Sequence, residues 1–278
     1  MGNDRLGILL ILLGMSFFSI QDVLIKLIIL DASLLQVLVF RALLGSIILL
    51  CFLYFTKREI KLGSAYPAIA IFRGVIFSVL ILKNSIGLHR LGAIILGLLG
   101  TLLIIKPSFN NFNWYMLLPL ITALTYSTSM TLSKLTSDKD NSFQQSFHIY
   151  IGGFVFGTII SILISSNFIS IENEQLKFLT NPWSFIDIKL LIPMLIIAVT
   201  GTVGIFCLVS AYRIGSPQSN APFEYILLIY SLITGYSIFG EIPDKLSLLG
   251  MVLIIFSGVY IFVRETIKDK LVATLKSR

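Results

Sequence analysis

Residues 221–263 read APFEYILLIYSLITGYSIFGEIPDKLSLLGMVLIIFSGVYIFV, two apolar runs joined by the polar turn Gly240–Lys245. Each run approaches the roughly 20 residues that a membrane-spanning helix needs. One acidic residue, Glu224, lies inside the first run. Pro222 comes two positions before it, and the aromatic Tyr225 follows it directly. The stretch therefore predicts a hairpin of two helices in lipid that carries a carboxylate.

The composition of the whole chain extends this prediction. The 278 residues are 56% hydrophobic and 13% charged, with a mean hydropathy of +0.94. A soluble domain is typically about 25% charged, so this chain has too few charges to cover a core with polar surface. The apolar runs are continuous and do not alternate, which excludes a β-barrel. We predict an all-α polytopic membrane protein.

The net charge of +7 does not indicate nucleic-acid binding. The basic residues gather in the loop Lys57–Lys61 and in the tail after Arg264, as they do in cytoplasmic segments under the positive-inside rule. We therefore expect a multi-pass membrane protein with both termini cytoplasmic. Its N-terminal apolar run has no small-residue cleavage site after it, so we interpret it as a retained helix.

The apolar runs also place the expected helices. We expect spans at 6–29, 34–55, 88–105, 112–132, 142–165 and 190–212, a short apolar segment at 67–82, and the closing hairpin. Residues 167–189 form the one long polar connection, which we expect to face outward.

An internal repeat is visible along the chain. Phe18–Lys26 and Tyr126–Lys134 both end a helix on lysine, at an offset of 108 positions. The glycine-rich helices that contain Gly92 and Gly250 match at an offset of 158. We predict two repeats, residues 1–107 and 108–278. Paired membrane repeats are typical of secondary transporters, in which two bundles rock about a central site.

The change in offset indicates a deletion in the first repeat. Gly74 aligns with Gly201 and Gly92 aligns with Gly250, so a distance of 18 residues in the first repeat corresponds to 49 in the second. The deficit of 31 residues is about one helix and a turn. The lost part corresponds to the region around Glu224, so any central site is expected to depend mainly on the second repeat.

Several of these features together resemble a known family. They are the Phe-x-x-x-x-Asp-x-x-x-Lys pattern at Phe17–Lys26, Phe40-Arg41, and Ala221–Tyr225 followed by Phe239–Asp244. The chain is similar over nearly its whole length to the EamA branch of the drug/metabolite transporter superfamily. The resemblance implies ten helices in two inverted five-helix repeats. The closing hairpin looks most like bacterial S-adenosylmethionine uptake transporters, and riboflavin importers share similar endings.

The sequence departs from that pattern because it offers eight or nine membrane segments where the family has ten. Nine spans would put the basic tail outside. The segment Pro67–Leu82 contains Arg73, and an arginine at the bilayer centre costs roughly 2.5–3.5 kcal/mol. We predict that this segment is re-entrant or interfacial, which leaves eight spans and a cytoplasmic tail.

Six residues are candidates for a substrate site. Glu224, with Tyr225 beside it, is suited to a cationic group or a coupling proton; alternatively it is an acid near the helix mouth. Arg41 is suited to a carboxylate or phosphate, or to a structural pair with Asp22. Asp22 and Lys26 lie one helical turn apart, either as a polar site or as an interfacial pair. Tyr126 is expected to line a cavity or to contact lipid.

No motif of an enzyme, a metal site or a resident cofactor accompanies these residues. The sequence has no Gly-Lys dipeptide for a Walker loop and no His-Glu-x-x-His, so a gradient or exchange would have to drive transport.

The leading hypothesis is alternating-access transport of a small organic metabolite, with S-adenosylmethionine uptake implied by the resemblance. The alternatives are a truncated, non-transporting remnant or assembly partner, an amino-acid exporter, a riboflavin-like importer, or a subunit of a lipid-linked-sugar flippase. The expected partners are the metabolite and membrane lipid, and a homodimer is left open.

Overall fold

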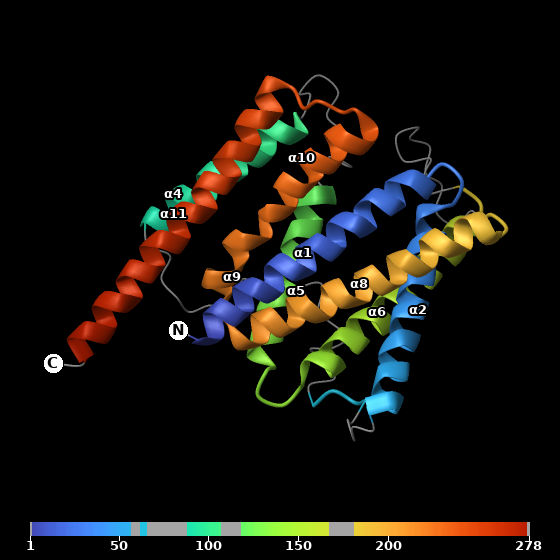
Figure 1. Cartoon of the computed structure of the whole chain (residues 1–278), viewed down its shortest axis with the longest axis horizontal. Coiled ribbons are helices and arrows are strands. Elements are labelled where there is room, and N and C mark those ends of the chain that lie inside the picture. Colours follow the sequence, from blue (N-terminus) through green and yellow to red (C-terminus); the bar gives the residue numbers. More distant parts are fainter. Residues whose placement is uncertain (1, 57–61, 66–87, 107–117, 167–180, 277–278) are drawn as a thin grey trace. The chain divides into compact units, whose positions relative to one another are not determined.

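The computed structural model describes residues 2–56, 62–65, 88–106, 118–166 and 181–276, and the ordered elements among them are helices (Figure 1). The helices are α1 Gly2–Ile28, α2 Leu34–Thr56, α4 Leu88–Ile105, α5 Leu118–Leu135, α6 Ser142–Ser165, α8 Ile188–Ile214, α9 Pro217–Glu224, α10 Ile226–Phe239 and α11 Lys245–Lys276. Six described stretches are long and apolar enough to cross a membrane: Asp4–Ile28, Leu34–Thr56, Ser142–Ser165, Ile188–Ile214, Ser219–Phe239 and Lys245–Arg264. The prediction of an all-α polytopic membrane protein is confirmed.

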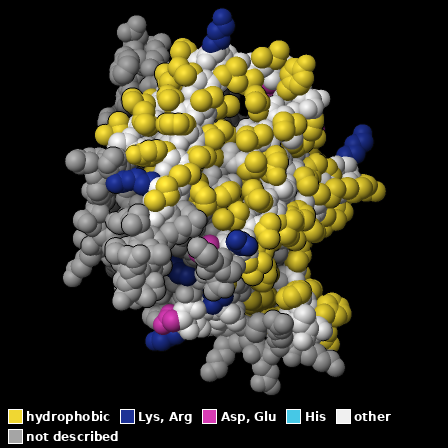
Figure 2. All heavy atoms as spheres, turned by 60° about the vertical axis from the view of Figure 1, so that its left-hand side comes forward, with side chains coloured by type: hydrophobic (Ala, Val, Ile, Leu, Met, Phe, Trp, Pro, Cys, Tyr) yellow, Lys and Arg dark blue, Asp and Glu magenta, His cyan; other side chains and the backbone are white. Residues whose placement is uncertain are grey.

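Apolar side chains cover much of the surface of the described residues. Leu30, Tyr54 and Phe185 are 89%, 81% and 91% exposed. Figure 2 shows one face on which hydrophobic side chains far outnumber charged ones. Soluble monomers rarely expose apolar patches larger than a few hundred Å². Lipid is therefore the natural surrounding for this surface.

The described residues form two compact units. Unit 1 draws on the ranges Met1–Leu12, Phe72–Leu135 and Ser210–Arg278, and unit 2 draws on Leu13–Ile71 and Thr136–Val209. Each unit takes helices from both halves of the chain, so neither unit coincides with one of the two sequence repeats.

In unit 2, α2 and α6 pack side by side in opposite directions (Figure 1). A Cβ at Gly45 would lie 2.7 Å from the ring of Tyr150, and one at Gly157 would lie 2.9 Å from Val39. The residue numbers rise on one helix as they fall on the other, which shows that the helices are antiparallel. Small residues let membrane helices approach this closely, because packing replaces the hydrophobic effect in lipid.

Polar contacts hold the two ends of unit 2. At one end, Ser64 Oγ and the Ala65 amide donate to the Asp140 carboxylate at 2.5 and 2.8 Å, and Gln144 Nε2 donates to the Gly63 carbonyl at 3.0 Å. α2 therefore ends where α6 begins.

At the opposite end, Gln36 on α2 bonds the segment before α8. Its Nε2 donates to the Ser184 carbonyl at 2.8 Å, and its Oε1 accepts from the Ser184 amide at 3.0 Å. The same end holds an apolar cluster that includes Ile28 at the end of α1 and Leu190 near the start of α8. α1 and α8 therefore run in opposite directions within unit 2.

In unit 1, α4 and α11 form a second antiparallel pair (Figure 1). A Cβ at Gly100 would lie 2.7 Å from the Gly250 carbonyl, so the two backbones touch where both residues are glycine. The end of α4 is joined to the start of α11 by an ion pair between Lys106 and Asp244. The pair lies outside the apolar core and is exposed.

The helix bounds differ from the expected ones in two places. The first run of the closing hairpin is not one helix, because it breaks at Tyr225 between α9 and α10. The last helix does not stop at the membrane surface but continues through the basic tail to Lys276. The predicted re-entrant segment Pro67–Leu82, with Arg73, lies outside the described residues, as does the first part of the expected span 112–132.

Candidate substrate site

Glu224 in unit 1 lies at the break between α9 and α10. Ser216 caps the start of α9, accepting from the Ser219 amide at 3.1 Å. Pro222 has no amide hydrogen to continue the helical ladder. The chain turns tightly there, with the Tyr225 amide 3.4 Å from the Pro222 carbonyl, before α10 begins. The proline that follows α9's polar start therefore explains why a carboxylate comes to lie at a helix interruption.

Tyrosine hydroxyls surround the Glu224 carboxylate. Tyr212, near the end of α8 and 4% exposed, donates its hydroxyl to Glu224 Oε1 at 2.6 Å. Tyr126 on α5 interacts electrostatically with the same carboxyl, and its buried hydroxyl has no hydrogen-bond partner of good geometry. Tyr225 is a third neighbour. Among the residues that the structure describes, the groups that act on Glu224 within unit 1 are therefore neutral donors, not cations.

Close packing against α11 fixes the position of this break. A Cβ at Gly258 would lie 2.2 Å from the ring of Tyr225, so only glycine leaves room for that ring. Phe223 meets Phe262 edge to face, with ring centroids 5.1 Å apart. The two residues that flank Glu224 thus pack against α11, and this packing fixes the position of the carboxylate.

Lys134, considered in the sequence only as a helix end, has a structural contact in unit 1. Its Nζ donates to the Arg213 carbonyl at 2.8 Å, at the end of α8. A lysine at a helix C-terminus satisfies carbonyls that have no partner in the helix and matches the helix dipole. This contact positions the end of α8, on which Tyr212 lies.

The remaining candidates lie in unit 2. Arg41 on α2 is partly buried, and its Nε is buried without a hydrogen-bond partner. Asp22 and Lys26 on α1 are exposed. The cation whose charge acts on Asp22 is Arg41. The candidates thus form two groups, an acid among tyrosines in unit 1 and a base near an acid in unit 2.

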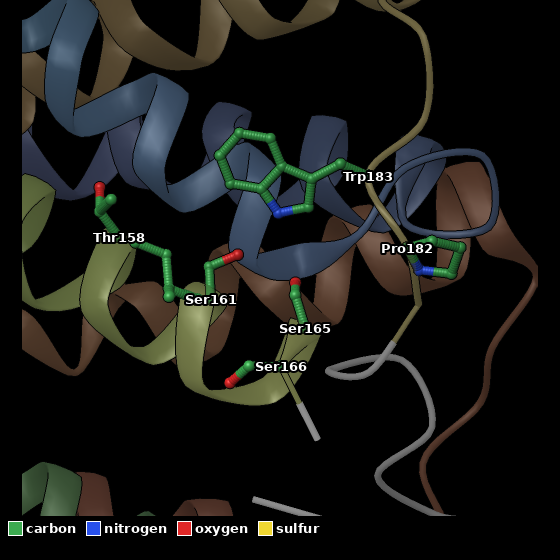
Figure 3. A pocket seen from close by; sticks show the side chains of 7 residues that line it. Thr158, Ser161, Ser165, Ser166, Pro182 and Trp183 are labelled. Carbon is green, nitrogen blue, oxygen red and sulfur yellow. The ribbon is translucent and has the colours of Figure 1, made fainter. Parts of the chain in front are cut away.

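A hollow of about 530 Å³ lies in unit 2 beside the end of α6. Figure 3 shows hydroxyl-bearing residues of α6 on one side and the segment with Trp183 and Pro182 on the other. The hydroxyls belong to Thr158, Ser161, Ser165 and Ser166. None of the sequence candidates lines this hollow, and sequence reasoning missed it because it depends on which face of α6 meets the segment before α8.

Comparison with known proteins agrees with this architecture. The pattern of the EamA-like transporter family matches residues 113–264, more than half of the chain. The chain belongs to the EamA-like transporter family. It is accordingly a multi-pass membrane protein of a transporter family, and not of an enzyme family.

Several curated relatives resemble this EamA-family chain at low identity. It is 24% identical to the S-adenosylmethionine uptake transporter of Rickettsia prowazekii, over 95% of this chain and 96% of that protein. An uncharacterized transporter of Helicobacter pylori is 26% identical over 84% of this chain and 75% of its own. The riboflavin transporter of Vibrio cholerae is 25% identical over 68% of this chain and 58% of its own.

The first of these alignments also bears on the deletion. It extends over 302 residues, whereas this chain has 278, so the alignment opens gaps in this chain. The length of the alignment does not place these gaps, so the deficit between Gly74 and Gly92 stays a prediction.

Proposed function

We propose that this EamA-family protein is a secondary transporter that moves a small organic metabolite across the bacterial inner membrane by alternating access. S-adenosylmethionine uptake is the best single assignment. It is supported by the relative from Rickettsia prowazekii that carries this name and aligns over 96% of its length. The single observation that carries the proposal is the Glu224 carboxylate, bonded by Tyr212 at 2.6 Å at a helix break.

The chemistry of Glu224 fits the cationic part of such a metabolite. An ionised carboxylate is costly to bury unless a cation joins it, and the described part of unit 1 brings tyrosine hydroxyls to Glu224 but no cation. A sulfonium or ammonium group would provide the missing charge, and tyrosine rings also attract cations. Interrupted helices are a recurring place for substrate groups in transporters. Tyr126 and Tyr225 would line this cation site.

The carboxylate of the metabolite would require a base. Arg41 and Lys26, both in unit 2, are the candidates from the sequence, with Asp22 beside them. Arg41 is favoured because its Nε is buried and lacks a partner, whereas Lys26 is exposed and has an interaction of its own.

The uptake assay tests the proposal directly. Cells that express the protein should accumulate labelled S-adenosylmethionine. Glu224→Gln should reduce the initial rate by about tenfold or more, because hydrogen bonds and ion pairs to a charged group contribute about 1.5–3 kcal/mol. Glu241→Gln, in the turn after α10, is the matched acidic control and should keep a rate within about twofold of wild type. Membrane levels of each variant are measured in parallel.

The outcomes of this assay separate the alternatives. Uptake of riboflavin but not of S-adenosylmethionine would favour the function named for the Vibrio cholerae relative, and efflux of amino acids would favour an exporter. Failure to move any metabolite, at normal membrane levels, would leave the truncated remnant or assembly partner as the function.

We also propose that both termini are cytoplasmic. The contacts of Asp140 with Ser64 and Ala65 mean that the chain leaves α2 and enters α6 at one membrane side, so it crosses an even number of times in between. The spans expected from the sequence at 88–105 and 112–132, which contain α4 and α5, would supply two crossings. This parity supports the tail placement that the positive-inside rule predicts.

Cysteine accessibility in intact cells tests the topology. Single cysteines at Ser64 and at Asn84 should both be labelled only after the membrane is permeabilised. Labelling of the Asn84→Cys variant from outside would show that one more crossing lies between these positions, and it would place the tail outside.

A further inference from the structure

Three buried polar atoms in unit 2 lack hydrogen-bond partners of good geometry. They are Oε1 of Gln21, Nε of Arg41 and the hydroxyl of Tyr150. The side chains of Gln21 and Tyr150 are only 4% and 3% exposed. Buried polar side chains are bonded in the great majority of cases, so each exception needs an explanation. A ligand that supplies the missing partners is one such explanation.

Two of the three atoms, Gln21 Oε1 and Arg41 Nε, meet over Gly201 on α8, and the Tyr150 hydroxyl is a neighbour of Arg41. A Cβ added to Gly201 would lie 2.5 Å from Gln21 Oε1 and 2.8 Å from Arg41 Nε. The hydroxyl of Tyr150 lies beside Arg41 and beside Thr202, the next residue on α8. Only a residue without a side chain lets these groups approach the α8 backbone. We call Gln21, Arg41, Tyr150 and Gly201 the Gly201 nest.

The surroundings of the Gly201 nest carry both signs of charge. Arg41 is partly exposed, so its terminal nitrogens remain within reach from outside the packed core. The exposed carboxylate of Asp22 neighbours both Arg41 and the Gln21 amide. Asp22 and Arg41 attract each other, but they form no ion pair among the described residues. The nest therefore offers donors and acceptors side by side, and Gln21 Oε1 and Arg41 Nε keep no hydrogen-bond partner of good geometry.

We propose that the Gly201 nest binds the α-amino-acid head group of the transported metabolite. This inference rests on the proposed transport function and deepens it by naming a substrate class. The carboxylate accepts hydrogen bonds from Arg41 Nε and the Tyr150 hydroxyl. The ammonium group donates to Gln21 Oε1 and pairs with Asp22. All partners of the head group belong to unit 2.

The chemical balance favours a zwitterion over other ligands. A lone anion such as phosphate would satisfy Arg41 and Tyr150 but would leave the Gln21 oxygen unpaired and would face Asp22 repulsively. A neutral ring system such as an isoalloxazine brings no charge for Arg41 or Asp22. An α-amino acid carries one negative and one positive group a few bonds apart, and both signs find partners here.

A binding assay on the full-length protein in lipid nanodiscs tests the proposal. The probe is labelled S-adenosylmethionine, and the competitors are S-adenosylhomocysteine, which keeps the head group, and methylthioadenosine, which lacks it. L-methionine is tested separately for its effect on thermal stability. We expect S-adenosylhomocysteine to compete at least about tenfold better than methylthioadenosine, which corresponds to losing an ion-paired group.

Two glycine variants on α8 form a matched pair. Gly201→Ala places a methyl group in the nest and should weaken binding of the probe by about tenfold or more. Gly204→Ala, one turn away, meets only the ring of Phe18, at 3.0 Å, and should bind within about threefold of wild type. Arg41→Lys keeps the charge but removes the planar donor, and should fall between them.

The possible results separate this inference from the transport function. Equal competition by both adenosine compounds, or unchanged binding by Gly201→Ala, would overturn the nest. Failure of all head-group compounds to bind or stabilise the protein would overturn it as well. Transport of riboflavin with no response to amino acids would refute the nest and leave transport standing. Binding with the expected variant pattern, but without uptake into cells, would support the nest and refute transport.

Discussion

The Glu224 cluster of unit 1 and the Gly201 nest of unit 2 surround a partly buried charge in different ways. Glu224 is bonded by the neutral hydroxyl of Tyr212, and no cation among the described residues of its unit acts on it. Arg41 has a carboxylate nearby but forms no ion pair with it, and its Nε is unpartnered. The first cluster lacks a counter-charge, whereas the second has one held apart. The difference agrees with the cation that we propose for Glu224 and with the zwitterion that we propose for the nest.

Neutralising Glu224 and Arg41 one at a time should give the largest effects, and each change should weaken a different class of substrate. Glu224→Gln should weaken cationic substrates by about 100-fold but leave uncharged analogues little affected, because only the cation loses its partner. Arg41→Gln should instead weaken every substrate that carries a carboxylate. Uptake competition with a panel of charged and uncharged analogues measures both. Equal losses across the panel in both variants would show that the residues serve structure and not recognition.

The hydrogen bond to Glu224 should give the next largest effect. Tyr212→Phe removes the donor at 2.6 Å and keeps the ring, so we expect uptake to fall by about tenfold. Tyr225→Phe keeps the ring that packs on Gly258, and we expect a change of about threefold or less. Initial uptake rates at matched membrane levels decide between them. A larger loss of uptake rate in Tyr225→Phe than in Tyr212→Phe would show that the hydroxyl of Tyr225 at the helix break, and not that of Tyr212 on α8, is the one that recognises substrate.

The packing that supports the break should be visible in stability. Gly258→Ala forces a methyl group against the Tyr225 ring, and overpacking of this kind costs about 1–3 kcal/mol. Gly152→Ala on α6 meets no atom within 4 Å and should change stability by less than about 0.5 kcal/mol. Thermal unfolding in detergent compares the two variants. An unchanged midpoint for Gly258→Ala would mean that the break is not held by α11.

The ion pair between Lys106 and Asp244 should give the smallest effect. The hydrogen bond from Lys106 lowers the pKa of Asp244 from 3.8 to about 2. Because the folded pKa is depressed, the contribution of the pair is complete above about pH 4 and is lost as the pH falls toward 2. The difference in melting temperature between wild type and Asp244→Asn should therefore be small and constant from pH 5 to 8. A difference that varies over this range would show that another group titrates with the pair.

The sequence predicted the parts of this molecule that depend on local composition. Continuous apolar runs predicted the helices, and Pro222 predicted weakened helical bonding beside Glu224. The break at Tyr225 comes three residues after that proline, and the family resemblance was confirmed by the match over residues 113–264. The division into two repeats at residue 107 stays a prediction, because each compact unit of the structure combines segments from both halves of the chain.

The partners of the charged residues could not be predicted from the sequence. Tyr212 lies 12 positions before Glu224, and Tyr150 and Gly201 lie far from Arg41 in the chain. Which face of a helix meets which neighbour is decided by packing, and helices that are apolar all round give little signal of facing. The sequence identified Gly201 only as the residue that aligns with Gly74 in the internal repeat. In the structure, its lack of a side chain lets Gln21 and Arg41 approach each other.

The hydrogen bonds between Gln36 and Ser184 make the neighbouring Trp183 suitable as an intrinsic fluorescent probe. They tie Trp183 to α2 beside the hydroxyl-lined hollow, and the only other tryptophan of the chain is Trp114. Trp114→Phe would therefore leave a single fluorophore that is anchored on one side and 47% exposed on the other. The wavelength of its fluorescence emission would depend on the polarity around the start of α8. Movement of this helix during a transport cycle would therefore shift the emission, and no added label would be needed.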